Sequence, residues 1–130
     1  WCITDITTSD NNYDMGSLYI EDADNWRIIA PTISGPQPFN PGGEMALWTS
    51  PDAGVTWTQR RQMTRNSERN HTFARRPVNA HADFYAFWAD GHARQPSESN
   101  LYFCNRDGDV FRLSRVMDAD TTAPECCRPY

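Results

Sequence analysis

The octapeptide Ser50-Pro51-Asp52-Ala53-Gly54-Val55-Thr56-Trp57 is the most informative stretch of this 130-residue chain. It fits the pattern S-x-D-x-G-x-T-W, which is typical of a tight turn between two antiparallel strands. Asp52 can accept backbone hydrogen bonds across the turn, and Gly54 can adopt the positive φ angle that the turn requires. Thr56 and Trp57 would begin the returning strand, with the indole packed beneath the turn. The motif therefore predicts a β-hairpin in which Asp52 has a structural role.

Short strands are predicted on both sides of this turn, because apolar and β-branched runs alternate with turn residues. No segment keeps a helical periodicity over ten or more residues. Asp107-Gly108 is a strong signal for a further hairpin, and residues 34–43 predict a loop because they contain three prolines and three glycines. After a lead-in strand over Trp1–Thr7, the expected strands are Met15–Glu21, Trp26–Thr32, Glu44–Ser50, Thr56–Thr64, Phe73–Ala80, Phe84–Asp90, Asn100–Asn105 and Asp109–Ser114. The predicted fold class is all-β, built from antiparallel hairpins.

The spacing of these strands predicts a repeated unit. Four strands fall between residues 15 and 64, and a similar set begins near Phe73. Repeated four-stranded units of this length are typical of β-propeller blades, about 4 to 8 of which close a ring. We therefore expect two blades, 15–64 and 65–117, between a lead-in segment, 1–14, and a tail, 118–130. Two blades cannot close a ring, so further blades are expected from a longer chain, a second chain or further copies. A small β-sandwich is the alternative.

Composition limits the classes of function. The chain has 17 acidic and 12 basic residues, a net charge of −5, and no basic tract, so nucleic-acid binding is not expected. No apolar stretch approaches the roughly 20 residues that span a bilayer, and no signal peptide opens the sequence. Every basic residue is arginine. Codon bias would explain this, and so would a surface that binds carboxylates bidentately.

The four cysteines, Cys2, Cys104, Cys126 and Cys127, lack the spacing of a zinc site. Their even number is compatible with an oxidising compartment, so a secreted or periplasmic location is expected. One of the two adjacent cysteines could reach Cys2 if the chain ends meet, but the pairing stays open. No cofactor is expected. Calcium ligands could come from Glu44, Asp118 and Asp120, although no loop has a recognisable calcium spacing.

All three histidines fall within 22 residues, which makes this region the candidate site. If Phe73–His81 is extended, alternate side chains share one face. That face would carry His71, Arg75, Asn79 and His81. Pro77 suggests that the strand borders an edge, such as the central channel of a propeller. Arg76, His92 in a glycine-containing loop, and Tyr85 in an apolar strand complete the candidates. The alternative is that the arginines pair with carboxylates and the histidines are structural.

The sequence from about Tyr13 to Leu113 resembles the BNR-repeat (Asp-box) β-propeller family. The octapeptide is similar to the Asp-box itself, which in that family lies at the blade periphery, away from the catalytic funnel. The segments that carry the resemblance are Asp14–Tyr19, Trp26–Thr32, Asn40–Glu44, Asn70–Gly91, Pro96–Ser99 and Leu101–Phe103. They correspond to the C-terminal blades of longer, sialidase-like or lyase-like proteins. Related seven-bladed members are lyases that act on uronate polymers such as ulvan and rhamnose–glucuronate chains.

The resemblance implies β-elimination, in which a base removes the C5 proton of a uronic acid and the C4 oxygen leaves. A cation must neutralise charge on the substrate carboxylate, and Arg75 or Arg76 suits this role. His71 is the first candidate for the base and His81 the second. Tyr85 could protonate the leaving oxygen. These are the predicted catalytic residues, His71, Arg75, His81 and Tyr85, with substrate binding by Arg76, Asn79 and His92 and the remaining groups supplied by other blades.

Two other functions stay open. A sialidase-like hydrolase would need a tyrosine–glutamate pair, but Glu68, Glu98 and Tyr85 show no spacing that indicates one. A non-catalytic propeller fragment would bind carbohydrate, or would pair its exposed strand edges with another chain. In each case the expected partners are a polysaccharide or oligosaccharide and further blades.

Overall fold

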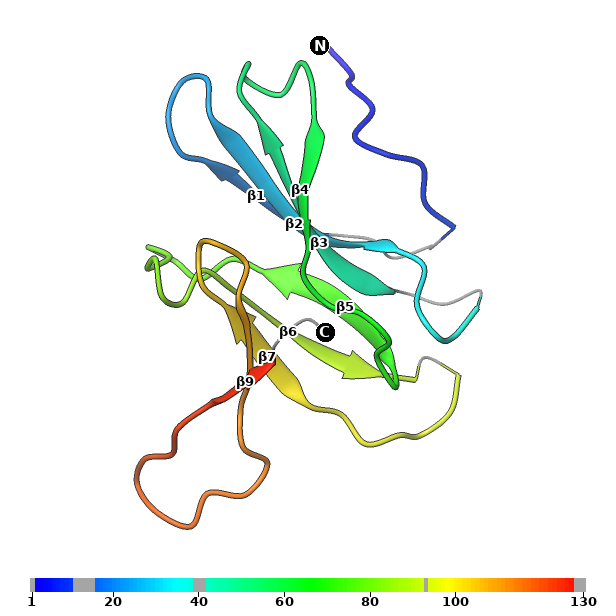
Figure 1. Ribbon diagram of the computed structural model, residues 1–130, viewed down its shortest axis with the longest axis vertical. Coiled ribbons are helices and arrows are strands. Elements are labelled where there is room, and N and C mark those ends of the chain that lie inside the picture. Colours follow the sequence, from blue (N-terminus) through cyan, green and yellow to red (C-terminus); the bar gives the residue numbers. More distant parts are fainter. Residues whose placement is uncertain (1, 11–15, 39–41, 93, 128–130) are drawn as a thin grey trace.

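The computed structural model describes residues 2–10, 16–38, 42–92 and 94–127, which form nine strands and no helix (Figure 1). The strands are β1 (Ser17–Ile20), β2 (Trp26–Ile33), β3 (Glu44–Ser50), β4 (Thr58–Gln62), β5 (Asn70–Arg75), β6 (Ala86–Gly91), β7 (Leu101–Cys104), β8 (Val110–Arg112) and β9 (Glu125–Cys127). They build two open antiparallel sheets, ordered β1-β2-β3-β4 and β5-β6-β7-β8-β9. The all-β prediction is confirmed. Within the described ranges no helix is long and apolar enough to cross a membrane.

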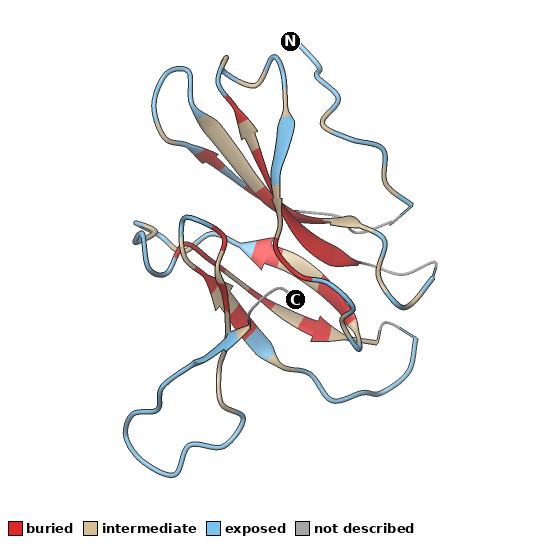
Figure 2. Cartoon of the chain, viewed as in Figure 1, coloured by how far each residue is buried: buried red, intermediate tan, exposed pale blue. Residues whose placement is uncertain are grey.

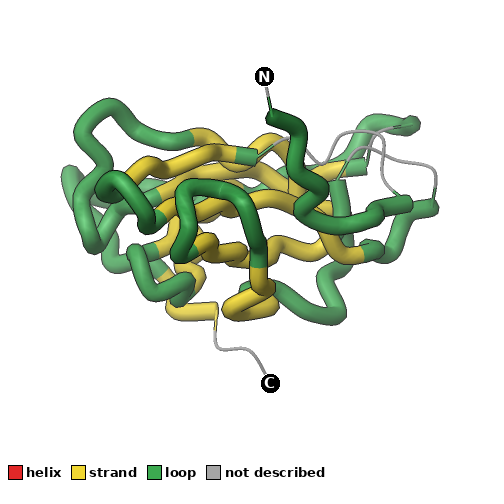
Figure 3. The backbone as a smooth tube through the Cα atoms, turned by 90° about the horizontal axis from the view of Figure 1, so that it is seen from above, coloured by secondary structure: helices red, strands yellow, loops and turns green. Residues whose placement is uncertain are grey.

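The two sheets pack face to face around one apolar core (Figures 2 and 3). Alternation along the strands explains this packing, because side chains two apart share a face. In β1 the Tyr19 side chain is buried in the core, whereas its neighbours Leu18 and Ile20 point outward and are about half exposed. The largest buried side chain, Trp88 of β6, meets Tyr102 of β7 with the two rings stacked at 6.1 Å. The core therefore lies between the sheets. On the outer face of the first sheet, Leu18 and Ile20 of β1 are about half exposed, whereas Ala46 and Trp48 of β3 are buried.

The predicted hairpin turn at residues 50–57 is confirmed, but the returning strand β4 begins at Thr58, so Thr56 and Trp57 precede the strand and do not begin it. The Asp52 carboxylate accepts hydrogen bonds from the Thr56 backbone N–H (2.8 Å) and the Thr56 hydroxyl (2.6 Å). Gly54 has a φ of 84°, and its carbonyl accepts a hydrogen bond from the Trp57 indole at 3.1 Å. Because the Asp52 carboxylate is used within the turn, its role is structural. The second predicted turn is also present, with Gly108 at a φ of 85° between β7 and β8.

The strand predicted over Phe73–Ala80 is wrong in its bounds, because β5 begins at Asn70 and ends at Arg75. The ladder between β5 and β6 shifts register between Thr72 and Arg75, where Phe73 has a φ of 50°. Beyond Arg75 the chain turns away, and Asn79 adopts a φ of 55°. A positive φ interrupts the alternation of faces. The expected shared face is therefore not formed.

Both ends of the chain also differ from the prediction. Residues 2–9 form no strand, and Thr4–Thr7 border a hollow with Leu18 on the outer face of the first sheet. Alternating polar residues gave this segment a strand-like pattern, but no strand pairs with it. The tail contains β9, which was not expected because three residues are too short for a periodic pattern. Trp1 and Met15, predicted as the first residues of two strands, lie outside the described residues, as do parts of the family-like segments near residues 14 and 40.

Candidate functional site

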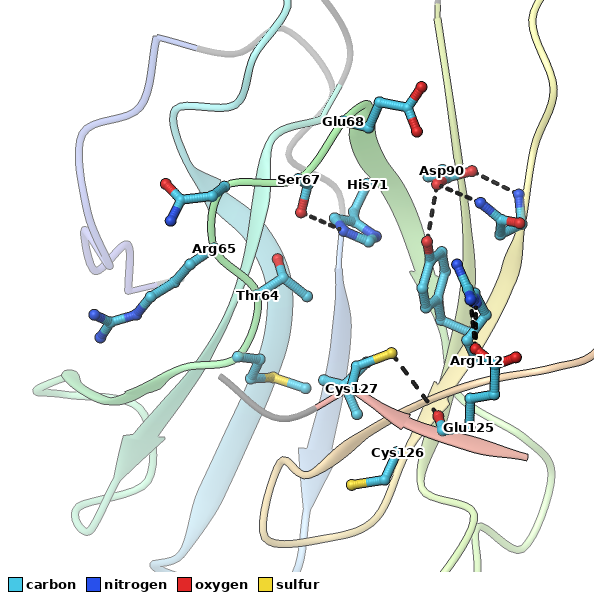
Figure 4. A pocket seen from close by; sticks show the side chains of 15 residues that line it. Thr64, Arg65, Ser67, Glu68, His71, Asp90, Arg112, Glu125, Cys126 and Cys127 are labelled. Carbon is cyan, nitrogen blue, oxygen red and sulfur yellow. Dashed lines mark hydrogen bonds and ion pairs between the residues drawn. The ribbon is translucent and has the colours of Figure 1, made fainter. Parts of the chain in front are cut away.

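Two pockets at opposite ends of β5 collect the chemically interesting side chains. The larger is a cavity of about 570 Å³ between the sheets, and we call it the His71 pocket. The β4–β5 connection forms one side of it, with Thr64 and Ser67, and the second sheet forms the other, with Asp90 and Arg112 (Figure 4). The smaller, about 380 Å³, lies beyond the other end of β5, and we call it the Arg76 pocket. Both volumes fall within the range of small-molecule sites.

His71 is held by hydrogen bonds on both ring nitrogens. The Trp88 indole N–H donates to Nδ1 at 2.8 Å, and Nε2 lies 2.9 Å from the Ser67 hydroxyl. Because that hydroxyl donates to the Glu44 carboxylate at 2.7 Å, the proton of the neutral ring is on Nε2. The side chain is only 3% exposed. Burial lowers the pKa of His71, and the Glu44 and Asp90 carboxylates oppose this effect only in part.

This arrangement gives His71 a structural role. A general base needs a free nitrogen facing the substrate, and neither nitrogen of His71 is free. Glu44, which ends the chain of hydrogen bonds, also accepts from the Thr64 hydroxyl (2.5 Å) and the Ser67 backbone N–H (2.8 Å). The result is a buried carboxylate with three donors that fixes the β4–β5 connection to β3. His71 therefore forms part of the pocket wall, which agrees with the alternative that the histidines are structural.

The rest of the His71 pocket is polar. Asp90 is buried and accepts hydrogen bonds from the Tyr102 hydroxyl (2.9 Å) and the Asn100 backbone N–H (2.6 Å). Burial and the Asp90 carboxylate raise the pKa of Tyr102, so its hydroxyl keeps its proton at neutral pH. On the neighbouring strand β8, Arg112 is paired with Tyr102 and donates from Nε (3.1 Å) and Nη2 to one oxygen of Glu125 (Figure 4). The pocket thus combines proton donors, a carboxylate and a cation.

The cysteines make no disulfide, since Cys2, Cys104, Cys126 and Cys127 are all free thiols. Cys126 and Cys127 of β9 also border the His71 pocket. Burial raises the pKa of Cys127, so its thiol is not activated. The pairing of Cys2 with β9 that the sequence left open is not formed.

The Arg76 pocket contains a tyrosine–glutamate pair. The Tyr85 hydroxyl donates to Glu21 at 2.7 Å, and Glu21 is also bonded by Arg27 (2.9 Å) and by both Nε and Nη2 of Arg106 (2.8 Å each). The pKa of Glu21 is lowered to about 2, mainly by the hydrogen bonds from Arg106. The hydrogen bond from Tyr85 and the charges of Arg27 and Arg106 act in the same direction, and together these effects outweigh burial, which would raise the pKa. Burial, reinforced by Glu21, raises the pKa of Tyr85 above its ordinary value. Arg76 lies at the edge, with its guanidinium carbon 5.0 Å from the centroid of the Tyr19 ring.

The predicted site residues are therefore divided. His71 borders one pocket, and Arg76 and Tyr85 border the other. Four residues belong to neither pocket and are exposed or lie in loops: Arg75, Asn79, His81 and His92. His81 lies 3.5 Å from Asp83, and the His92 ring accepts a hydrogen bond from the Arg94 backbone N–H.

Sequence reasoning missed Tyr102, Arg112, Glu21 and Arg106 as site residues. One local signal was available for the His71 pocket, because Asp90 follows Ala86 and Trp88 on the buried face of β6. A carboxylate in such a position needs hydrogen-bond donors, and these come from β7.

No group of histidine, cysteine, aspartate or glutamate side chains within the described ranges is arranged to hold a metal ion. Glu44, named as a calcium ligand by the sequence, has its carboxylate occupied by Thr64 and Ser67, and Asp118 and Asp120 are exposed. Searches with protein-family models, among curated proteins and among solved structures find no match to this chain.

Proposed function

We propose that the chain is part of a carbohydrate-active β-propeller that binds a uronic-acid-containing polysaccharide in the His71 pocket and contributes to its β-elimination. The propeller assignment is supported by two consecutive antiparallel sheets, each ordered as in the sequence, and by the Asp-box turn in the first. Strands β1–β4 fall within residues 15–64 and β5–β8 within 65–117.

Exposed and partly exposed apolar side chains on the outer faces of both sheets also favour further blades. On the first sheet Leu18 and Ile20 point outward. On the second, Phe84, Phe103 and Phe111 form a ladder with centroids 5.0 Å apart at each step. Exposed apolar patches of this kind are typical of surfaces that pack against another protein layer. In a propeller each blade is covered on both faces, so these patches would meet neighbouring blades.

The observation that carries the proposal is the presence of Arg112, Tyr102 and Asp90 in one pocket. Arg112 already binds a carboxylate, that of Glu125, through two of its nitrogens. A uronate carboxylate would take the place of Glu125. The ion pair is about half exposed, so opening it costs little. In the elimination step the Tyr102 hydroxyl would break its hydrogen bond to Asp90 and give its proton to the leaving oxygen, while the base that takes the C5 proton would come from another blade.

Hydrolysis of the sialidase type is the second candidate, because the Tyr85–Glu21 pair is the arrangement such an enzyme needs. Two features place it second. Glu21 is already neutralised by Arg27 and Arg106, and the raised pKa of Tyr85 makes its oxygen a weak nucleophile. Formation of new reducing ends without an unsaturated product would favour hydrolysis over elimination.

The test uses two variants with opposite expected effects. Arg112→Gln removes the cation and should weaken binding of glucuronate oligosaccharides about tenfold or more, since a charge-assisted hydrogen bond contributes about 1.5–3 kcal/mol. Glu125→Gln releases Arg112 from its internal carboxylate and should strengthen binding. Arg60→Gln, on the exposed strand β4, is the matched control. Binding is measured by calorimetry, and elimination by the ultraviolet absorbance of the unsaturated uronate. Equal affinities for Arg112→Gln and Arg60→Gln would refute the assignment.

A further inference from the structure

We propose that the Arg76 pocket is a second, separate binding site that takes the carboxylate of a uronic acid. It lies beyond the opposite end of β5 from the His71 pocket and shares no lining residue with it. It is bordered by β1 and the residue after it, by the β5–β6 connection, and by the β7–β8 turn. The residues are Tyr19, Ile20 and Glu21, then Arg76, Ala80, Ala82 and Tyr85, and finally Arg106.

Arg76 is the group that would bind the carboxylate. Its guanidinium carbon lies 5.0 Å from the centroid of the Tyr19 ring, and Nη1 is 3.4 Å from the Leu18 carbonyl oxygen. These two contacts orient the planar group and leave its other N–H donors available. Among the carboxylates of the described residues, none lies within ion-pair distance of Arg76. Every other arginine that borders this pocket or supports it is bound to Glu21.

The charge around the pocket favours an anion. Two arginines, Arg76 and Arg106, line the pocket together with one carboxylate, Glu21, and Glu21 is also bound by Arg27 from outside the pocket. The chain as a whole has a net charge of −5, which makes this local excess of positive charge unusual. Glu21 holds Arg106 by two hydrogen bonds of 2.8 Å, which fixes its position next to the pocket. Such preorganisation reduces the ordering cost of binding.

The shape and the hydroxyl point to a sugar acid. Ala80 and Ala82 have small side chains and leave a space of about 380 Å³ beside Arg76. The Tyr85 hydroxyl, which donates to Glu21, has an oxygen that can still accept a hydrogen bond from a ligand hydroxyl. A ring that carries both a carboxylate and hydroxyl groups would use Arg76 and Tyr85 together. A peptide C-terminus would offer the same carboxylate without the hydroxyls.

The experiment titrates the full chain with methyl β-glucuronide and follows the methyl NMR signals of Ala80 and Ala82. The neutral methyl β-glucoside tests the need for the carboxylate, and N-acetylglycine tests the peptide source. Arg76→Gln should weaken glucuronide binding at least tenfold, whereas Arg75→Gln, at the adjacent exposed arginine, should leave it unchanged. Arg112→Gln should also leave the Ala80 and Ala82 response unchanged, which separates this site from the His71 pocket.

Four outcomes would overturn the proposal. Arg76→Gln and Arg75→Gln could bind glucuronide equally, which would remove Arg76 from the site. The glucoside could bind as tightly as the glucuronide, so that the carboxylate would not be recognised. N-acetylglycine could bind as tightly as the glucuronide, in which case the ligand would be a general carboxylate rather than a sugar acid. Finally, the single substitution Arg112→Gln could abolish the Ala80 response, which would show that only one site exists.

Discussion

Replacing Ser67 by alanine tests the hydrogen-bonded chain that shapes the His71 pocket. The Ser67 hydroxyl connects two buried groups, donating to Glu44 at 2.7 Å and accepting from His71 Nε2 at 2.9 Å. Its removal takes one charge-assisted hydrogen bond from Glu44, worth about 1.5–3 kcal/mol. It also leaves the Nε2–H of His71 buried without a partner, at a cost of about 1–3 kcal/mol. The two costs add to about 2.5–6 kcal/mol, and because Glu44 keeps its bonds from Thr64 and the Ser67 backbone, we expect a loss in the lower part of this range, about 2.5–4 kcal/mol.

The assay is urea unfolding of the variant and of a matched control. Ser114→Ala also removes a serine hydroxyl, but this one donates to the Val116 carbonyl in an exposed loop, so a loss below about 0.5 kcal/mol is expected. The slope of the unfolding curve should stay unchanged, because the surface exposed on unfolding is the same. If Ser67→Ala is no less stable than Ser114→Ala, the chain Glu44–Ser67–His71 does not contribute to the fold, and His71 would again be free to act as a base.

Two further predictions concern pH and the turn at residues 50–57. Burial lowers the pKa of His71 in the folded chain, so the unfolded chain takes up a proton first as the pH falls below about 6.5. The free energy of unfolding should therefore decrease from pH 7.5 to 5.5 in urea titrations. His71→Gln should flatten this pH dependence, whereas His81→Gln should not. An unchanged pH dependence in His71→Gln would contradict the argument. Gly54→Ala should cost about 1–3 kcal/mol, because φ is 84° and the new methyl would lie 2.8 Å from the Trp26 ring. Gly91→Ala is the control, since its methyl would meet only the Ser97 hydroxyl at 3.8 Å, and equal losses in thermal unfolding would refute the role of Gly54.

Local sequence signals were sufficient for most of the strands. Strand β3 has the predicted bounds, Glu44–Ser50, because its apolar run ends at the Asp-box turn, which has its own recognisable pattern. The turn at Gly108 was predicted for the same reason. The bounds of β5 were not predictable in this way, because Phe73 has a positive φ that no local rule assigns to phenylalanine. One such residue changes which side chains share a face, and the predicted grouping of histidines depended on that alternation.

The site could not be predicted because its contacts join distant parts of the chain. Glu21 and Arg106 are 85 positions apart, and Glu21 and Tyr85 are 64 positions apart. No spacing rule within one strand detects such pairs. A tyrosine–glutamate pair that no spacing in the sequence indicated is present, formed by Tyr85 and by Glu21, which directly follows β1. What the sequence did supply was Arg76 and Tyr85 as chemically suitable groups, and the fold brings these two into one pocket.

The arginine-only composition can now be interpreted through individual contacts. Guanidinium groups pair with carboxylates at Arg27, Arg61, Arg69, Arg106, Arg112 and Arg115. Most of these pairs are partly exposed and contribute little to stability. Two of them border the His71 and Arg76 pockets, where Arg112 holds Glu125 and Arg106 holds Glu21. In each pocket an internal carboxylate occupies an arginine as a uronate would. An arginine can bind a carboxylate with two nitrogens and a lysine cannot, so Arg112→Lys should lose uronate affinity although the charge is retained.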